Sequence, residues 1–218
     1  MAMTEFAVTA PPRPIVPVEG TSAVFPVRRI LCVGRNYAAH RAEMGGDDRD
    51  PPFFFSKPAD AVVPPGRDVP YPSATQNLHH EIELVVAIGE GGKVFGYAAG
   101  VDLTRRDLQA KAKDKGQPWD AAKGFDASAP ISAIRKVDGP SPRGRIRLSV
   151  NGQVRQDAKL SDMLWNVEEI IAEAGKLWKL EAGDLIFTGT PEGVGPLVCG
   201  DRVEGEVEGV GALSFRVV

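Results

Sequence analysis

Apolar residues follow periods that predict mostly β-strands in this chain. Residues 84–88 (Leu-Val-Val-Ala-Ile) are apolar at every position, which is typical of a strand buried on both faces. Glycine-rich turn residues follow at 89–92, and a second apolar segment runs over 94–101. This pattern predicts a β-hairpin between Leu78 and Asp102, with the two apolar segments as its paired strands.

Four further segments predict strands or hairpins. Residues 29–33 and 184–188 are short, mainly apolar runs of strand length. Residues 146–154 alternate between apolar and polar side chains and turn at Asn-Gly, which is a strong hairpin signal. Residues 203–218 are expected to close the fold as another hairpin around a glycine-containing turn.

Few segments show helical periodicity. The clearest begins at Asn166, a favourable N-cap, and Glu169 three residues later completes a capping box. Shorter helices are predicted over residues 37–44, after a cap at Asn36, and over residues 104–115. The apolar stripe of the first helix is expected to lie in the core and consists of Val167, Ile170, Ile171, Ala174, Leu177 and Trp178.

Strands that outnumber helices, without regular βαβ alternation, predict a β-rich α+β fold rather than a dinucleotide-binding fold. Residues 1–26 contain five prolines and little periodicity, so we expect an extended arm there, able to pack on a partner subunit. Residues 27–218 then form one domain, long enough to bury a core of its own.

Composition and charge exclude several classes of protein. The 218 residues carry a net charge of −3 without a cluster of Lys or Arg, so nucleic acid is not an expected partner. No apolar stretch approaches the roughly 20 residues of a membrane helix, and the N-terminus lacks a secretory pattern, so a cytoplasmic location without membrane contact is expected. Cys32 and Cys199, the two cysteines, are expected to be buried free thiols.

Three carboxylates make the predicted hairpin a candidate metal site. Glu81 and Glu83 are two positions apart, so on a strand both project from one face, and the hairpin returns Asp102 close to them. Without a cation these groups would repel one another and raise their own pKa values, whereas Mg²⁺ or Mn²⁺ prefers oxygen ligands. The alternative is a solvated strand end that binds no metal.

Histidines supply a second candidate site. His40 and Glu43 lie one turn apart on a predicted helix, where the carboxylate could orient the imidazole to deprotonate a water. Alternatively, they are a solvated surface pair. His79 and His80 precede Glu81 and are expected to hydrogen-bond around the carboxylates; the sharper alternative is that they orient a metal-bound water.

The glycine-rich segment 189–195 follows a predicted strand. It lacks the Gly-Lys-Ser/Thr ending of a phosphate loop and the dinucleotide fingerprint, so we do not expect nucleotide binding. Its backbone N–H groups and the Thr190 hydroxyl could bind a substrate carboxylate. An ordinary tight turn is the alternative.

Five short motifs follow one another along the chain. They are residues 32–40 (Cys-Val-Gly-Arg-Asn-Tyr-Ala-Ala-His), 80–84 (His-Glu-Ile-Glu-Leu), 100–109 (Gly-Val-Asp-Leu-Thr-Arg-Arg-Asp-Leu-Gln), 123–126 (Lys-Gly-Phe-Asp) and 188–195 (Thr-Gly-Thr-Pro-Glu-Gly-Val-Gly). Together they resemble the fumarylacetoacetate hydrolase family, and within it the branch of acylpyruvases and fumarylpyruvate hydrolases. The resemblance extends over residues 27–218.

The resemblance implies a fold, a metal site and roles for named residues. The implied fold is the family's mixed β-sandwich roll with a few short helices, assembled as a homodimer. Mg²⁺ or Mn²⁺ would be held by Glu81, Glu83 and Asp102, and His40 with Glu43 would form a dyad that activates water. Contacts to the substrate are implied for Lys123, which is also catalytic, and for Gln109, Arg35 and Thr190.

The implied reaction is hydrolysis of the C3–C4 bond of a 2,4-dioxo acid. The metal acts as a Lewis acid at the pyruvoyl end, His40 deprotonates the attacking water, and Lys123 adds positive charge near the leaving enolate. Fumarylpyruvate would give fumarate and pyruvate, as in gentisate-type aromatic catabolism. The enzymatic alternatives are a 2-oxo diacid isomerase or tautomerase and an oxaloacetate-type decarboxylase; a non-enzymatic metal-binding scaffold is the third hypothesis.

The substitution His40→Ala tests the implied dyad. Loss of the base should lower turnover by about 10²- to 10⁴-fold. Affinity for Mg²⁺ should stay nearly unchanged, because His40 is not among the expected ligands. Steady-state kinetics and titration calorimetry measure the two quantities, and wild-type turnover in the variant would remove His40 from the mechanism.

Overall fold

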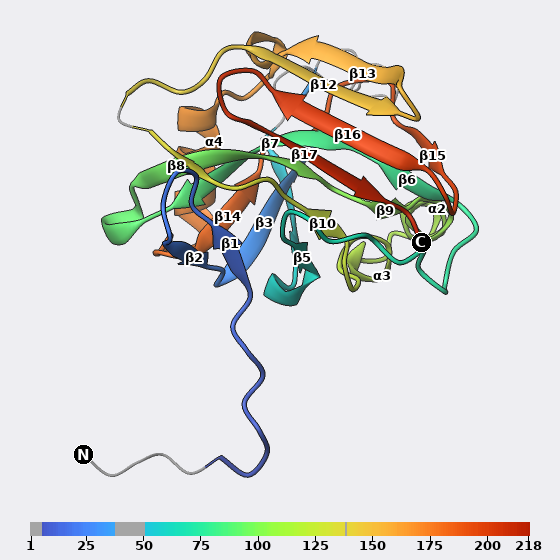
Figure 1. The fold of residues 1–218 in the computed structure, drawn as a ribbon, viewed down its shortest axis with the longest axis horizontal. Helices are drawn as coiled ribbons and strands as arrows, with labels where there is room; N and C mark the ends of the chain where they lie inside the picture. The colour runs from blue at the N-terminus through green and yellow to red at the C-terminus, as the bar shows by residue number, and fades with distance from the viewer. Residues whose placement is uncertain (1–5, 38–50, 138) are drawn as a thin grey trace.

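The structure is a computed structural model that describes residues 6–37, 51–137 and 139–218. Strands dominate it and its helices are short, which confirms the predicted β-rich α+β class. A mixed sheet of six strands and an antiparallel sheet of four pack face to face around a shared core (Figure 1). Two small two-stranded sheets contribute to a second core on the other face of the six-stranded sheet.

Hydrogen bonds join neighbouring strands into two large and three small sheets within the described ranges. The six-stranded sheet consists, in spatial order, of β11 (Arg135–Lys136), β8 (Val94–Val101), β7 (Ile82–Ile88), β14 (Asp184–Phe187), β3 (Arg29–Gly34) and β4 (Phe53–Lys57). The four-stranded sheet consists of β13 (Gln153–Lys159), β12 (Arg145–Val150), β16 (Arg202–Val207) and β17 (Gly211–Arg216). The small sheets are β15 (Gly195–Leu197), β6 (Leu78–His80) and β9 (Thr104–Arg105); β1 (Ile15–Pro17) and β2 (Val24–Pro26); and β10 (Ala129–Pro130) and β5 (Val62–Val63).

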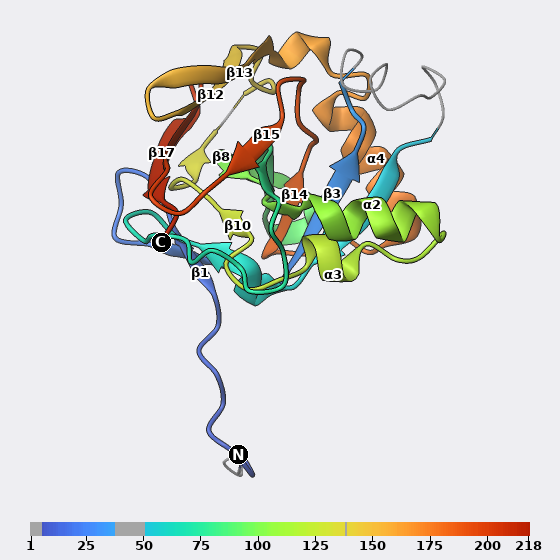
Figure 2. The ribbon, with the colours of Figure 1, turned by 90° about the vertical axis from the view of Figure 1, so that its right-hand side faces the viewer.

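The described helices are placed between these strands. The α-helices are α2 (Arg106–Asp114), α3 (Asp120–Lys123) and α4 (Val167–Leu177), and α2 and α3 lie next to each other (Figure 2). Single 3-10 turns are η1 (Ala59–Ala61), η2 (Glu90–Gly92) and η3 (Leu160–Asp162). None of the helices in the described ranges is long and apolar enough to cross a membrane.

Strand β7 is the central element of the six-stranded sheet. It pairs with β8 on one side and β14 on the other, and all of its residues are buried. Leu84 and Val86 pack in the core between the two large sheets, whereas Val85 and Ala87 face a second core on the opposite side. Burial on both faces explains why the strand is apolar from Leu84 onward, and its pairing with β8 confirms the predicted hairpin.

A short hairpin of β1 and β2 covers the second core. Val16 and Phe25 are buried there, while the chain before β1 extends away from the domain (Figure 1). The hairpin refines the expectation of an extended arm over residues 1–26. Three-residue strands that contain Pro17 and Pro26 are too short to show a periodic pattern. The domain boundary at residue 26 stays a prediction.

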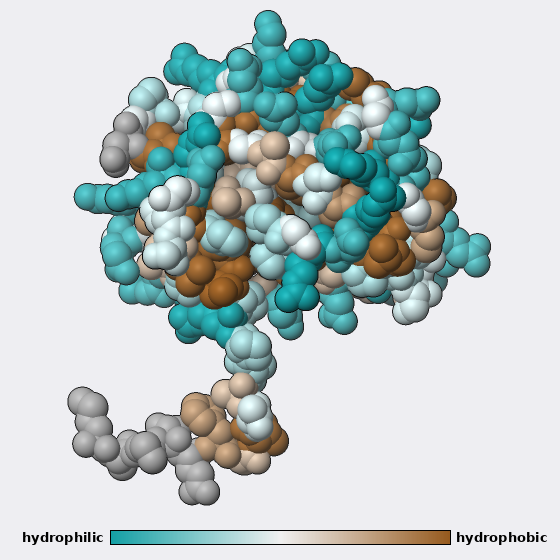
Figure 3. Space-filling model, in the orientation of Figure 1, coloured by the Kyte–Doolittle hydropathy of each residue, from teal (hydrophilic) through white to brown (hydrophobic). Residues whose placement is uncertain are grey.

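The β12–β13 hairpin turns where the sequence predicts it. Asn151 has φ 52° and Gly152 has φ 77°, the left-handed conformations that a two-residue hairpin turn requires. Ile146 and Leu148 are buried, and the residue between them is exposed. The outer surface over β12 and β13 is accordingly mostly hydrophilic (Figure 3). The closing hairpin is also confirmed, as β16 and β17.

Helix α4 begins with the predicted capping box. Asn166 Oδ1 accepts a hydrogen bond from Glu169 N at 2.9 Å, and Glu169 Oε2 accepts one from Asn166 N at 3.0 Å. The core stripe is confirmed for Val167, Ile170 and Ala174 but wrong for Leu177, which is 61% exposed. Leu177 is the last residue of the helix, where the final turn faces solvent.

Two other predictions have mixed outcomes. Helix α2 confirms the helix predicted over residues 104–115, although the first two residues of the predicted segment, Thr104 and Arg105, form strand β9. Cys32 is a buried thiol as expected, but the prediction is wrong for Cys199, which is exposed in the turn between β15 and β16. The helix predicted over residues 37–44 lies almost entirely outside the described residues.

Gly100→Ala tests the packing behind the hairpin. A Cβ at Gly100 would meet Val85 Cγ2 at 2.6 Å and Phe187 Cε1 at 2.7 Å, and both neighbours are buried in the second core. Such overpacking should lower the free energy of unfolding by about 1–3 kcal/mol, as measured by urea denaturation. Gly175→Ala is the control, because open space surrounds that helical position and alanine there should raise stability by up to ~1 kcal/mol. Equal stability of the two variants would contradict the packing described.

Candidate functional site

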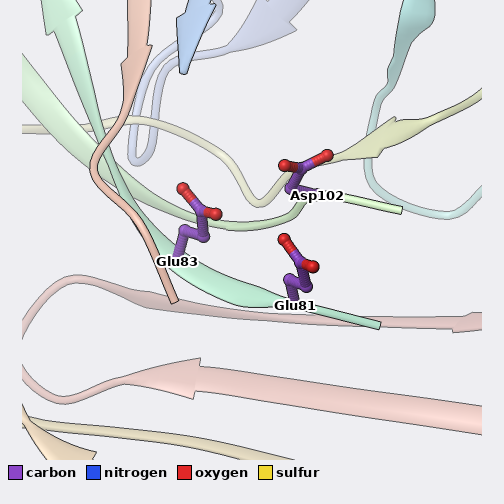
Figure 4. A group of neighbouring side chains, drawn as sticks. All are labelled: Glu81, Glu83 and Asp102. Carbon is purple, nitrogen blue, oxygen red and sulfur yellow. The ribbon is translucent and has the colours of Figure 1, made fainter. Parts of the chain in front are cut away.

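The structure brings the three predicted carboxylates together at one end of the β7–β8 hairpin. One carboxylate oxygen from each of Glu81, Glu83 and Asp102 lies within 4.8 Å of the other two (Figure 4). All three side chains are buried, with residue exposures of 5%, 1% and 0%. This burial excludes the alternative of a solvated strand end.

Strand geometry accounts for the convergence. Glu81 directly precedes β7 and Glu83 is its second residue, so in this extended segment their side chains project to one side (Figure 4). Glu83 pairs in register with Gly100 of β8, and Asp102 is two residues further along. The backbone N–H of Asp102 donates to Glu81 O at 2.8 Å, which holds the ends of the two strands together.

Cationic side chains surround two of the three carboxylates. Lys123 Nζ lies 2.7 Å from Glu81 Oε2 and 2.6 Å from Asp102 Oδ2. Lys57 Nζ lies 2.8 Å from Asp102 Oδ1 and donates to Leu103 O at 3.0 Å. Arg106 Nη2 lies 2.6 Å from Glu81 Oε1. Because both lysines are almost completely buried, these ion pairs are screened little by water.

Glu83 is held differently. Its Oε2 accepts a hydrogen bond from Gly189 N at 2.7 Å, in the loop after β14. Burial raises the pKa of Glu83 well above its ordinary value, and the charges of Asp102 and Glu81 raise it further. Burial acts to lower the pKa of Lys123, but Asp102 and Glu81 outweigh it and raise that pKa above its ordinary value. Glu83 is therefore the group that a nearby divalent cation would stabilise most in its ionised form.

The donor chemistry of the cluster fits a hard divalent cation. Three oxygen ligands from carboxylates, without a sulfur or imidazole among them, are the set that Mg²⁺ and Mn²⁺ prefer. A bound cation would also relieve the repulsion among the three carboxylates. Their assignment as ligands stays a prediction that this geometry supports.

A small pocket opens beside the carboxylates. The predicted substrate-contact residues Arg35, Gln109 and Thr190 all line it, as does Lys123. Arg35 has φ 61°, a conformation that non-glycine residues seldom adopt and that recurs at functional sites. Arg106 Nη1 donates to Gln109 Oε1 at 2.5 Å, which leaves the Gln109 amide N–H groups as its donors.

Aromatic rings form one wall of this pocket. The ring centroids of Phe55 and Trp119, which both line it, are 5.8 Å apart. Lys123 Nζ lies 5.0 Å from the centroid of Phe55, so the ring contacts the same ammonium group that pairs with the carboxylates. The planes of the two rings are tilted by 53° to each other. This wall is apolar, whereas the carboxylate end of the pocket is charged.

The two neighbouring histidines contact residues around the carboxylates, as expected. Arg106 Nε donates to His79 Nδ1 at 3.3 Å, and His80 Nδ1 lies 3.0 Å from Gln156 Oε1. Burial, and then the charge of Arg106, lower the pKa of His79 to about 4, so this ring is neutral at pH 7. His40 and Glu43 lie outside the described residues, and their roles stay predictions.

The loop after β14 is fixed by buried hydrogen bonds. Thr188 Oγ1 donates to Leu84 O at 2.9 Å, and Asn36 Nδ2 donates to Thr188 O at 2.8 Å. Asn36 Oδ1 accepts from Trp165 N at 2.8 Å, so this side chain joins two distant segments. The helix that Asn36 is predicted to cap lies almost entirely outside the described residues. Of the backbone donors predicted for a substrate carboxylate, the N–H of Gly189 is used by Glu83 instead.

Three buried or partly buried residues at the site are absent from the sequence predictions, namely Lys57, Arg106 and Gln156. Lys57 ends strand β4 behind three phenylalanines, and a lysine at a buried strand end is the one signal that could have found it. Arg106 stands four residues after Asp102, within a motif already noted. Gln156 comes from β13 of the other sheet, and no local pattern marks it.

Comparisons with known proteins agree with this geometry. Residues 29–218 match the family described as fumarylacetoacetate (FAA) hydrolase, C-terminal. The fumarylpyruvate hydrolase of Ralstonia sp is 45% identical over 176 residues, covering 76% of this chain and 92% of the relative. The mitochondrial oxaloacetate tautomerase FAHD1 of Mus musculus is 43% identical over 202 residues, covering 87% of this chain and 91% of the relative.

A solved structure extends the comparison to the fold. The crystal structure of fumarylpyruvate hydrolase from Pseudomonas aeruginosa, in complex with Mn²⁺ and pyruvate, superimposes with a TM-score of 0.92 at 47% sequence identity. The similarity covers 97% of this chain and 98% of that one. The sandwich described above is therefore the fold of that enzyme.

Binding of Mn²⁺ should release protons. Burial and the neighbouring carboxylates raise the pKa of Glu83, and a cation binds the ionised form, so affinity should fall as pH falls through that raised pKa. Titration calorimetry in two buffers of different ionisation enthalpy measures the released protons. Glu83→Gln should weaken Mn²⁺ binding by at least about 10-fold and abolish most of the proton release. Glu206→Gln on the exposed face of β16 is the control, and unchanged affinity in Glu83→Gln would break the ligand assignment.

Proposed function

The chain belongs to the fumarylacetoacetate hydrolase family, and we propose that it is a metal-dependent hydrolase that cleaves the C3–C4 bond of a 2,4-dioxo acid. The observation that carries the proposal is the buried cluster of three carboxylates and Lys123 beside a pocket. A relative 47% identical over nearly the whole chain, crystallised with Mn²⁺ and pyruvate, supports it. We propose fumarylpyruvate as the substrate, with fumarate and pyruvate as products.

The charge of the site supports a substrate with two carboxylates. In their ionised forms, Glu81, Glu83 and Asp102 are balanced by Lys57, Lys123 and Arg106, which are paired with two of them. A bound divalent cation, together with Arg35 on the pocket wall, then leaves an excess of about three positive charges. A dicarboxylate such as fumarylpyruvate offsets more of this excess than acetylpyruvate, which carries one carboxylate only.

The proposed metal is Mn²⁺ or Mg²⁺, held by Glu81, Glu83 and Asp102. When bound, it supplies Lewis acidity that polarises the oxygens at the pyruvoyl end of the substrate. Lys123 stands between Glu81 and Asp102 with its ammonium on the pocket wall, so it adds positive charge where the enolate of pyruvate develops.

The other pocket residues position the substrate. Gln109 offers its amide N–H groups, and Arg35 and Thr190 offer donors to carboxylate oxygens. The apolar wall of Phe55 and Trp119 suits the packing of an unsaturated acyl group such as fumaryl. In this proposal His40 takes a proton from the attacking water, and Glu43 orients the imidazole of His40. The proton is later transferred to the leaving carbanion.

Tautomerisation of oxaloacetate is the second candidate function. It is favoured by the tautomerase relative at 43% identity, of which the chain covers 91%. The same cluster would hold a 2-oxo diacid, and only a proton would move between carbon and oxygen. The two functions differ in whether a water attacks the C4 carbonyl.

A homodimer and a role in gentisate-type aromatic catabolism are also proposals, based on the family resemblance.

Metal-dependent cleavage of fumarylpyruvate is the expected outcome. Protein stripped with a chelator should be inactive, and Mn²⁺ or Mg²⁺ should restore the release of fumarate and pyruvate. The reaction is monitored by the decrease in enol absorbance and by assay of both products. Turnover should be faster with fumarylpyruvate than with acetylpyruvate, because fumarylpyruvate offsets more of the excess positive charge. Oxaloacetate run in parallel decides the alternative, since rapid keto–enol exchange without cleavage of fumarylpyruvate would make the protein a tautomerase.

A further inference from the structure

Gln156 joins two separate walls of the site from the opposite sheet. It belongs to β13 and its side chain is completely buried. Its amide oxygen accepts hydrogen bonds from Ile82 N at 3.1 Å and from His80 Nδ1 at 3.0 Å. Its amide nitrogen donates to Thr190 Oγ1 at 2.8 Å and to Pro191 O at 2.9 Å. One side chain thus contacts both the carboxylate-bearing strand and the loop that carries Thr190.

The orientation of this amide is determined by backbone atoms. The N–H of Ile82 can only donate and the carbonyl of Pro191 can only accept, so the oxygen of Gln156 must face Ile82 and its nitrogen must face Pro191. The reverse orientation would place donor against donor and acceptor against acceptor in a completely buried position. Gln156 therefore offers Thr190 a hydrogen and not a lone pair.

The Thr190 hydroxyl must then donate its hydrogen bond to a group other than Gln156. Its oxygen accepts from Gln156, and a hydroxyl has a single hydrogen to donate. Within the described parts of the chain no acceptor for that hydrogen is found, and Thr190 lines the pocket beside the carboxylates. The hydrogen is left to point at whatever occupies the pocket.

We propose that Gln156 is a positioning residue that makes the Thr190 hydroxyl a dedicated donor to an anionic oxygen of the substrate. The inference rests on the proposed function, because the acceptor is a carboxylate of the bound acid. A hydroxyl that is free to rotate could accept as well as donate, and would discriminate less between a carboxylate and a neutral group. Gln156 removes that freedom without touching the substrate.

The same amide determines the proton position on His80. Because Gln156 Oε1 can only accept, Nδ1 of His80 must carry a hydrogen, and the neutral ring then has its lone pair at Nε2. ¹⁵N-detected NMR of the native protein at pH 8 reads this tautomer, with the signals assigned by comparison with His80→Gln. A neutral His80 with its hydrogen on Nε2 would overturn the proposal, whether or not any substrate is cleaved.

A double-mutant cycle tests the action through Thr190. Gln156→Met and Thr190→Val should each raise KM for fumarylpyruvate about 10-fold in the Mn²⁺-loaded enzyme, with smaller changes in kcat. The double variant should be no worse than Thr190→Val, because the hydroxyl that Gln156 orients is already gone. Effects that multiply in the double variant would overturn the proposal. Gln153→Met, on an exposed position of the same strand, is the matched control and should leave KM unchanged.

Failure of the proposed function would be distinguishable from failure of this inference. If the native enzyme does not cleave fumarylpyruvate, the cycle is measured on the dissociation constant of pyruvate with Mn²⁺ present, and the same non-additivity is expected. Mn²⁺ affinity should be equal in all four proteins, since neither residue is an expected ligand. If Gln156→Met does not fold, the tautomer in the native protein still decides for or against the amide orientation on which the proposal stands.

Discussion

Several ionised side chains lie close together in the interior of this protein. Removing them from water lowers the stability of the folded state unless each charge is paired with an opposite one. Glu81 and Asp102 lie within hydrogen-bonding reach of two buried lysines and an arginine, with Glu83 beside them and almost out of contact with water. Each charge there is tolerable only while its partners are held in place. The two cores, the loop after β14 and the short helix α3 all serve to keep those partners within hydrogen-bonding distance.

Strand β7 shows how folding and chemistry are combined. Its apolar residues are buried on both faces, which fixes its position between β8 and β14. Glu83 is its second residue, Glu81 directly precedes it, and Asp102 directly follows β8. The site is therefore built at the end of a hairpin whose strands are held in the sheet, and a rigid base of this kind holds ligands precisely enough for metal chemistry. Part of the pocket wall, in contrast, comes from connecting segments.

The local parts of the fold could be predicted from the sequence, whereas the long-range parts could not. The β7–β8 hairpin, the Asn151 turn and the Asn166 capping box each depend on residues close in the chain, and the structure confirms each of them. Lys57 and Gln156 reach the site from strands far away in sequence, so neither spacing nor periodicity marks them. The prediction for Leu177 is wrong for a related reason, since periodicity gives the face of a helix but not where its neighbour ends. The three carboxylates were predictable because a strand's period of two and a single hairpin suffice to bring them together.

The carboxylates lie on the hairpin, whereas part of the pocket wall lies on connecting segments. This separation affects how substrate and reaction can change among relatives. Arg35 follows β3, Trp119 precedes α3 and Thr190 follows β14, so these three wall residues each belong to a different connection. Substitutions there can reshape the acyl end of the pocket while the buried ionic cluster stays intact. Relatives with the same core can consequently differ in reaction, as hydrolase and tautomerase do, and directed evolution of substrate range should begin in these connections and leave the hairpin alone.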